Sequence, residues 1–423
     1  MNLVYPTQLS TQSMGTLAVN ITSILRARPI AGAKITISYT NFPGNAIETA
    51  VTNTIGKITP IELPAPPIDY SMEPSANQPY SEYDITVQAP GYEPVKITGA
   101  QVLPDVEAIQ NVSLVPLENA MGEGNTAESF VIPPNTLFGD YPPKIAENEI
   151  KSVDETGEIV LSKVVIPEFI VVHDGPPRDT SANNYYVRYR DYIKNVASSE
   201  IYATWPTSTI YANILAIQSF TLNRVYTEWY RNRGYNFTIT TSTAYDHKWV
   251  PGRNIFDTIS SAVDDIFANY LSRPNVVQPI FTQYCDGRQV SCPGWMTQWG
   301  SKYLGDQGQS AIEILRYFYG DDMYINTAEE ISGVPSSWPG QNLTIGVSSD
   351  KVRQLQNQLN VIANGYPLIP RISTDGVYGE QTAEAVRVFQ DIFDLPETGV
   401  VDFSTWYRIS EIYVAVSRIA ELA

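Results

Sequence analysis

Short runs of alternating apolar and polar residues fill the first 117 positions of the chain, and turn residues separate them. Because successive side chains of a strand point to opposite faces, this alternation predicts half-buried strands of an antiparallel sandwich. The clearest runs are 16–21, 33–39, 83–87 and 112–114. We therefore expect an N-terminal all-β sandwich, and we find no catalytic constellation in it.

A helical periodicity begins after position 206. Apolar residues recur with a spacing of three to four, at positions 210, 214, 217 and 221/222, which predicts an amphipathic helix. Thr207 or Ser208 can supply its N-terminal cap. Glu200 precedes this helix by one short loop, with Tyr202 and Trp205 beside it. The pattern therefore places one carboxylate at a corner between two helices.

The last 80 or so residues of the chain carry three further helical faces, with apolar residues again three or four positions apart. Such a pattern indicates a compact bundle of three helices. The three faces are Val352, Leu355 and Leu359; Ala385, Val386 and Phe389; and Phe403, Trp406 and Ile409.

Composition marks the boundaries between these parts. Small, polar and acidic residues without periodicity at 118–130 indicate a linker that a protease can cut. Prolines and acidic residues at 131–165 indicate an extended arm that lies against the next domain. We therefore expect a multidomain chain: a sandwich (1–117), an acidic linker (118–130), a central α+β domain with an N-terminal extended arm (131–337) and a three-helix domain (341–423).

Charge and composition exclude several classes of function. A net charge of −18 over 423 residues argues against nucleic acid or an anionic membrane as the main partner, because both are bound through clustered Lys and Arg. The N-terminus has neither the basic nor the apolar region of a secretion signal, and no run of 18 apolar residues occurs.

Cys285 and Cys292 are compatible with a small disulfide loop and equally with a reduced pair.

Two ordered motifs resemble the SpoIID family of peptidoglycan lytic enzymes. The first is Glu200, followed by Trp205-Pro206 and a helix rich in Ala and Gln; the second is the segment 296–301, followed by a closing helix at 314–320. The resemblance implies that Glu200 is the catalytic acid/base. Thr297 and Gln298 match polar positions of the second motif and either bind the sugar, orient Glu200 or form a structural turn. Tyr202 and Trp205 are candidates for raising the pKa of Glu200 and for binding substrate. Trp205, Trp295 and Trp299 are either stacking platforms for sugar rings or part of the core.

Other segments resemble known modules. The residues 375–382, 389–390 and 399–406 resemble landmarks of the three-helix peptidoglycan-binding domain, which implies peptidoglycan as a partner. The turns at 29–33, 54–57 and 89–92 resemble the carboxypeptidase-regulatory or transthyretin-like sandwich.

Glycosidic bond cleavage requires a proton on the leaving oxygen, which a carboxylic acid with a raised pKa supplies. A lytic transglycosylase needs a single Glu, because the muramic acid 6-hydroxyl attacks its own anomeric carbon. A muramidase needs a second carboxylate, for which Asp174, Asp179 and Asp191 are the candidates. A zinc amidase and a wall-binding protein without activity are the remaining alternatives.

Some members of the resembled family bind zinc through His and Cys, near a segment that corresponds here to 243–249. Only His247 offers a comparable ligand, and its position is shifted. The chain has two His residues, too few for a three-histidine catalytic zinc site. We therefore predict no metal and no cofactor, and we interpret His247 as structural.

The order of the domains resembles the spore cortex-lytic enzymes of clostridia. The resemblance implies a zymogen from which a subtilisin-like Csp protease removes the N-terminal segment during germination. We expect the cut within 116–130, although the arm up to Val165 is a second possibility. Without a standard signal peptide, we expect deposition in the spore, at its cortex or coat, from the mother cell.

Overall fold

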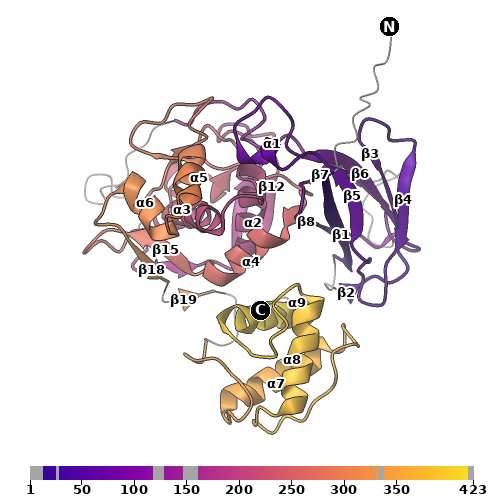
Figure 1. Ribbon diagram of the computed structural model, residues 1–423. Coiled ribbons are helices and arrows are strands. Elements are labelled where there is room, and N and C mark those ends of the chain that lie inside the picture. The colour runs from indigo at the N-terminus through magenta and orange to yellow at the C-terminus, as the bar shows by residue number, and fades with distance from the viewer. Residues whose placement is uncertain are drawn as a thin grey trace.

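A computed structural model describes residues 13–24, 28–117, 128–145, 161–328, 330–332 and 338–417. The chain is multidomain, with mixed helices and strands followed by a C-terminal helical region, as the sequence predicted (Figure 1). Within the described residues, no helix is both long and apolar enough to cross a membrane.

The N-terminal region consists of two sheets around a shared apolar core. In β1 (Ser13–Ser23) every second residue is buried, because one face of the strand packs on that core. β1 lies parallel to β8 (Glu107–Leu114) and antiparallel to β2 (Arg28–Pro29) and β5 (Ile61–Ala65). The second sheet contains β3 (Lys34–Tyr39), β4 (Ala46–Val51), β6 (Ser81–Gln88) and β7 (Val95–Val102), and α1 (Asp69–Met72) is a short helix between β5 and β6.

Both N-terminal sheets gain a strand from later in the chain. β9 (Glu128–Val131) pairs in parallel with β7, and β14 (Ile255–Phe256) pairs antiparallel with β8. Beside β14, the Asn254 side chain donates to the carbonyl of Gln101 at 2.8 Å and accepts its N–H at 2.9 Å. The sandwich is therefore joined to the central region by backbone pairing. The expected cleavage segment lies largely at 118–127, outside the described residues.

Five helices build the central region around α3 (Thr207–Tyr226), which is preceded by α2 (Tyr189–Glu200). The predicted amphipathic helix is present as α3, and 16 of its 20 residues are buried, because four helices pack around it. Pro206 holds the N-cap position without a side-chain bond, and therefore the predicted Thr207 or Ser208 cap is wrong. The surrounding helices are α2, α4 (Asp257–Ile266), α5 (Gln298–Asp306) and α6 (Ala311–Tyr319).

Short strands complete the central region, and a single-turn 3-10 helix lies at Arg231–Arg233. They are β10 (Val165–Ile166) with β19 (Glu330–Ile331); β11 (Phe169–His173) with β12 (Asn184–Arg188) and β13 (Ile239–Thr240); β15 (Asn269–Ser272) with β18 (Tyr324–Thr327); and β16 (Tyr284–Cys285) with β17 (Met296–Thr297).

A fully buried ion pair fixes the loop that follows β13. The Arg224 guanidinium in α3 donates to Asp246 at 2.8 Å, and both side chains are 0% exposed. Asp246 also accepts hydrogen bonds from the Tyr230 hydroxyl at 2.6 Å and from the Thr240 N–H at 2.9 Å. Burying two charges is favourable only when such bonds satisfy them. The pair thereby fixes the backbone at Lys248, two residues beyond Asp246.

Three helices form the C-terminal region: α7 (Asp350–Ile362), α8 (Glu380–Ile392) and α9 (Phe403–Ser417). Figure 1 shows this bundle, in yellow and pale orange, below the other two regions. Glu411 in α9 pairs with Arg190 in α2, and Asp394 pairs with Lys57 of the N-terminal region at 2.7 Å. The bundle therefore contacts both of the other regions.

Candidate active site

Glu200 is the last residue of α2, and its side chain is 3% exposed. The Lys248 N–H donates to one carboxylate oxygen, Oε1, at 2.6 Å. The Tyr284 hydroxyl donates to the other oxygen, Oε2. Both donors come from segments that follow α3 in the chain, and together they hold the carboxyl group in one orientation.

The end of α2 is itself held in place. A helix leaves its last carbonyl groups without intrahelical partners, so these groups need another donor when they are buried. The Gln298 side chain supplies one, since its Nε2 donates to the Glu200 carbonyl at 3.0 Å. Gln298 is the first residue of α5 and is 2% exposed. Of the two roles that the sequence offered for Gln298, this contact matches the orientation of Glu200.

Burial dominates the electrostatics of Glu200. It raises the pKa of the Glu200 carboxyl, because removal from water disfavours the charged form. The Lys144 charge and the bonds from Tyr284 and Lys248 act in the opposite direction on this pKa, since each favours the ionised form. A carboxylic acid that holds its proton more tightly than usual is suited to general acid catalysis near neutral pH.

A small pocket of about 50 Å³ adjoins Glu200. Its walls come from four sources: the end of α2 with the start of α5, the loop around Cys285, the loop after β13, and the segment before residue 146. The residues that line it with Glu200 are Thr136, Tyr141, Pro142, Lys144, Thr243, Tyr284, Cys285, Asp286, Gln289, Val290 and Gln298.

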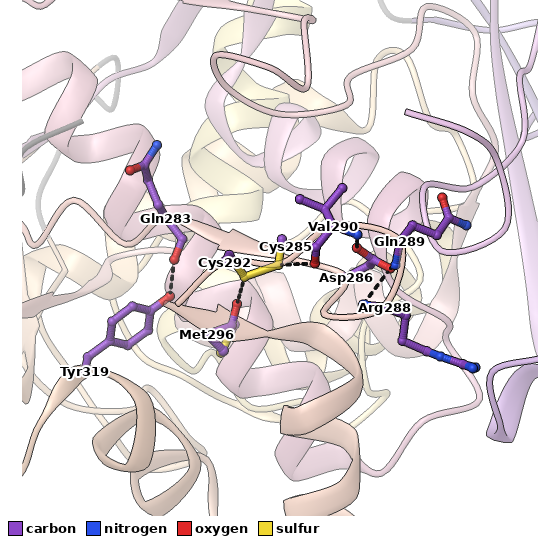
Figure 2. The surroundings of a disulfide bond; sticks show 9 residues. All are labelled: Gln283, Cys285, Asp286, Arg288, Gln289, Val290, Cys292, Met296 and Tyr319. Carbon is purple, nitrogen blue, oxygen red and sulfur yellow. Dashed lines mark hydrogen bonds between the residues drawn. A yellow bond between two sulfur atoms is a disulfide. The ribbon is translucent and has the colours of Figure 1, made fainter. Parts of the chain in front are cut away.

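A disulfide joins Cys285 to Cys292 and closes the loop beside this pocket (Figure 2). Inside the loop, the Asp286 carboxylate accepts the backbone N–H groups of Arg288 at 3.0 Å and Gln289 at 2.6 Å. The sequence left the state of the two Cys open, and here they are bonded. Asp286 is a second carboxylate in the pocket, and nothing in the sequence distinguished it.

Three aromatic residues predicted to bind substrate pack on one another. The Trp205 ring lies 5.1 Å from Trp299 and 5.8 Å from Tyr202, between ring centroids. Trp205 and Tyr202 are each 3% exposed, and the Trp205 indole N–H donates to the Ser71 carbonyl in α1 at 2.9 Å. The N-terminal region thus contacts this cluster through Trp205, and these aromatic residues do not line the Glu200 pocket.

The other predicted residues do not line the Glu200 pocket either. Thr297, at the end of β17, is half-buried and is not among the residues that line the pocket. Asp191 lies in the first turn of α2, about 13 Å along the helix from Glu200. Asp174 accepts a bond from Thr241 at 3.2 Å, and Asp179 bonds Ser181 in an exposed turn. None of the three Asp candidates lines the pocket.

His247 is fully buried beneath the pocket. Its Nδ1 lies 3.1 Å from the Tyr192 hydroxyl, and its ring stacks on Tyr284 with centroids 5.8 Å apart. Burial lowers the pKa of His247 well below its usual value, so the ring is neutral. The described residues include no group of three or more His, Cys, Asp or Glu placed to hold a metal ion. The expectation of no metal stays a prediction.

Residues 348–409 match the family model of a peptidoglycan binding domain. The match covers α7, α8 and the first half of α9, and it confirms the resemblance that the sequence suggested for this segment. It supports a cell-wall-associated protein with peptidoglycan as a partner. No curated protein matches the chain by sequence.

Solved structures share only parts of the chain. A Bacteroides fragilis protein of unknown function is 19% identical with a TM-score of 0.17, over 26% of this chain and 31% of its own. Wild-type catechol 1,2 dioxygenase from Acinetobacter radioresistens is 16% identical with a TM-score of 0.18, over 28% of this chain and 58% of the dioxygenase chain. The 5-hydroxyisourate hydrolase of Klebsiella pneumoniae is 20% identical with a TM-score of 0.16, over 24% of this chain and 90% of the hydrolase chain. The chain spans less than two thirds of the first two structures, and scores this low transfer no function.

Proposed function

We propose that the chain is the zymogen of a lytic transglycosylase that cleaves the MurNAc-GlcNAc glycan of spore cortex peptidoglycan. The observation that supports this most directly is the buried Glu200 carboxyl, with a raised pKa and two fixed donors, in a chain that also has a peptidoglycan-binding domain. The order of its domains resembles SleC, the spore cortex-lytic enzyme of clostridia, over essentially the full length.

The proposed reaction uses one carboxyl group twice. Protonated Glu200 gives its proton to the glycosidic oxygen, and the bond between that oxygen and the anomeric carbon breaks. The muramic acid 6-hydroxyl forms the new bond to the same carbon and releases its proton to Glu200. Bonds and protons balance without water, and the product ends in 1,6-anhydromuramic acid.

The donors around Glu200 suit both halves of this cycle. After the first proton transfer the carboxylate is charged and buried, which is costly without hydrogen bonds. The Lys248 N–H and the Tyr284 hydroxyl stabilise that charge from fixed positions. They also leave the carboxylate basic enough to accept the second proton, because burial keeps the Glu200 pKa raised.

A two-carboxylate muramidase is the second candidate, and a specific observation favours it. Asp286 lines the same pocket as Glu200, so two carboxylates adjoin one cavity. Against this reading, both Asp286 oxygens accept backbone N–H groups of the disulfide loop, including that of Val290 at 2.9 Å. An amidase and a non-catalytic wall-binding protein remain as further alternatives.

Activation and location belong to the same proposal. A subtilisin-like Csp protease removes the N-terminal segment during germination, and the enzyme acts in the spore, where it is stored at the cortex or coat. The resemblance to the cortex-lytic enzymes supports both points.

Digestion of purified spore cortex tests the proposal. The full chain is treated with a subtilisin-like protease, added to cortex beside the equally treated Glu200→Gln variant, and the products are identified by mass spectrometry. Anhydromuramic ends that disappear with the variant are the expected result. Reducing ends would instead establish a muramidase, and freed peptides would establish an amidase. Binding to cortex without any products would establish a non-catalytic wall-binding protein.

A further inference from the structure

The segment that follows β9 crosses the Glu200 pocket. Residues 132–145 are the described part of the arm beyond β9 and are called the arm from here on; they contain a turn at 136–139 and bind the backbone that carries Glu200. The Thr136 N–H donates to the Ser199 carbonyl at 2.9 Å, and the Asn135 side chain donates to the Ile201 carbonyl at 3.3 Å. The arm is therefore attached on both sides of Glu200 in the sequence.

The far end of the arm is attached as firmly. The Ile145 N–H donates to the Ala244 carbonyl at 2.6 Å, and the Ile145 carbonyl accepts from Gln283 at 2.8 Å. Between these two anchors the Lys144 side chain enters the pocket, and its ammonium donates to the Asp246 carbonyl.

The Lys144 ammonium occupies a site suited to a cation. It lies 5.0 Å from the ring centroid of Tyr284 and 5.5 Å from that of Phe220, within the range of a cation–π contact. Tyr284 is the residue whose hydroxyl donates to Glu200. A backbone carbonyl, two aromatic faces and a nearby carboxylate are thus directed at one positive charge.

The positive charge of Lys144 resembles the charge that develops on a sugar during glycoside cleavage. Glycoside cleavage passes through an oxocarbenium-like state, in which the anomeric carbon and ring oxygen become positive close to the catalytic carboxylate. With the Lys144 side chain in place, the free volume of about 50 Å³ holds a few water molecules and no sugar ring. The Lys144 charge also lowers the pKa of Glu200, so a smaller fraction of Glu200 is protonated and able to act as the general acid.

We propose that the pocket beside Glu200 contains a subsite for a positive charge, and that the chain's own Lys144 fills this subsite and keeps the zymogen inactive. The subsite takes primary alkylammonium ions, and sugars that carry a positive charge at or beside the anomeric carbon. This inference rests on the proposed function, because that function supplies the developing charge which the subsite would otherwise stabilise.

Replacement of Lys144 in the full chain tests the inference. Lys144→Ala removes three methylene groups and the ammonium, and leaves space for propylammonium. Without protease, this variant is expected to release glycan at least about tenfold faster than the wild type, since a tightly held internal inhibitor is lost. Millimolar propylammonium restores inhibition, whereas propanol, which has the same shape without the charge, does not. Lys34→Ala, at an exposed position of β3, is the matched control for charge removal.

Lys144→Met separates charge from bulk, because Met keeps much of the length. The inference expects the Met variant to be active without protease; inactivity equal to the wild type would show a purely steric block and overturn the charge subsite. An Ala variant that stays inactive, while protease-treated wild type cleaves cortex, would overturn the inference and leave the proposed function intact.

A binding readout covers the case in which no form cleaves cortex, which would refute the proposed function. Thermal unfolding of Lys144→Ala is then followed with propylammonium and with propanol. A stabilisation by propylammonium alone still supports the subsite, and equal effects of the two compounds would refute it.

Discussion

Replacing Glu200 by Gln should make the protein more stable, and the gain should depend on pH. Gln keeps an oxygen that accepts the Lys248 N–H but has no carboxyl proton. Burial raises the pKa of Glu200 in the folded chain above its ordinary value of 4.5. Between these two values the unfolded chain releases a proton that the folded chain retains, so the wild type loses stability as the pH rises.

The size of the effect follows from the shift. Each unit by which folding raises the pKa corresponds to about 1.4 kcal/mol of unfolding free energy. The stabilisation that the protonated Glu200 carboxyl provides is fully present below pH 4.5. It is lost as the pH rises to the folded-state pKa, and above that pKa the unfolding free energy no longer changes on account of Glu200. The Glu200 side chain is 3% exposed, so solvent screens little of it. The Gln variant should therefore gain about 1.4 kcal/mol over the wild type per pKa unit.

Urea unfolding of the full chain, followed by tryptophan fluorescence, measures this difference from about pH 4 to about pH 8. Glu48→Gln, at an exposed position of β4, controls for the substitution itself. If the difference between the Glu200→Gln variant and the wild type were the same at both ends of this pH range, the raised pKa of Glu200 and the argument for its role as an acid would be refuted.

Two further predictions concern residues that hold the site and the domains. Tyr284→Phe keeps the ring but removes the hydroxyl that donates to Glu200. That bond lowers the Glu200 pKa, and hydrogen bonds to charged groups are worth about 1.5–3 kcal/mol. The alkaline limb of the pH profile of cortex cleavage should therefore move up by about one pH unit. An unchanged pH profile of the protease-treated variant would contradict this. Glu411→Gln leaves Arg190 and Arg408 without their shared carboxylate, at a cost of about 3 kcal/mol, so calorimetry should show the C-terminal helices melting at a lower temperature than in the wild type. Identical melting curves would show that these ion pairs do not hold the bundle.

Periodicity in the sequence predicted the C-terminal helices well. Val352, Leu355 and Leu359 were expected on one face of a helix, and all three are fully buried in α7. A small helical bundle buries one face of each helix against its neighbours, so local spacing contains most of the information. The same rule located α3 but did not indicate how it is oriented, because a helix surrounded by other helices has no exposed face.

The surroundings of Glu200 could not be predicted in the same way. Its donors, Lys248 and Tyr284, lie 48 and 84 residues further along the chain. Lys248 contributes a backbone N–H, which every residue except Pro has, so its side chain gives no signal. The sequence left Trp205 open between a sugar platform and the core; it is buried, and its partner Ser71 lies 134 residues earlier, in another domain. Contacts of this kind depend on tertiary packing alone.

The position of the arm limits where an activating cut can act. A single cut within 116–130 separates the sandwich from the rest of the chain, yet it leaves residues 132–145 attached to the central region. Thr136 and Ile145 would keep their bonds to the backbone of α2 and to Ala244, and Lys144 would stay in the pocket. These bonds involve only the arm and the central region, so removal of the sandwich does not by itself break them. If Lys144 keeps the zymogen inactive as proposed, activation by proteolysis needs either a cut on the C-terminal side of Ile145 or the withdrawal of the arm together with β9, which remains paired to β7 of the departing sandwich.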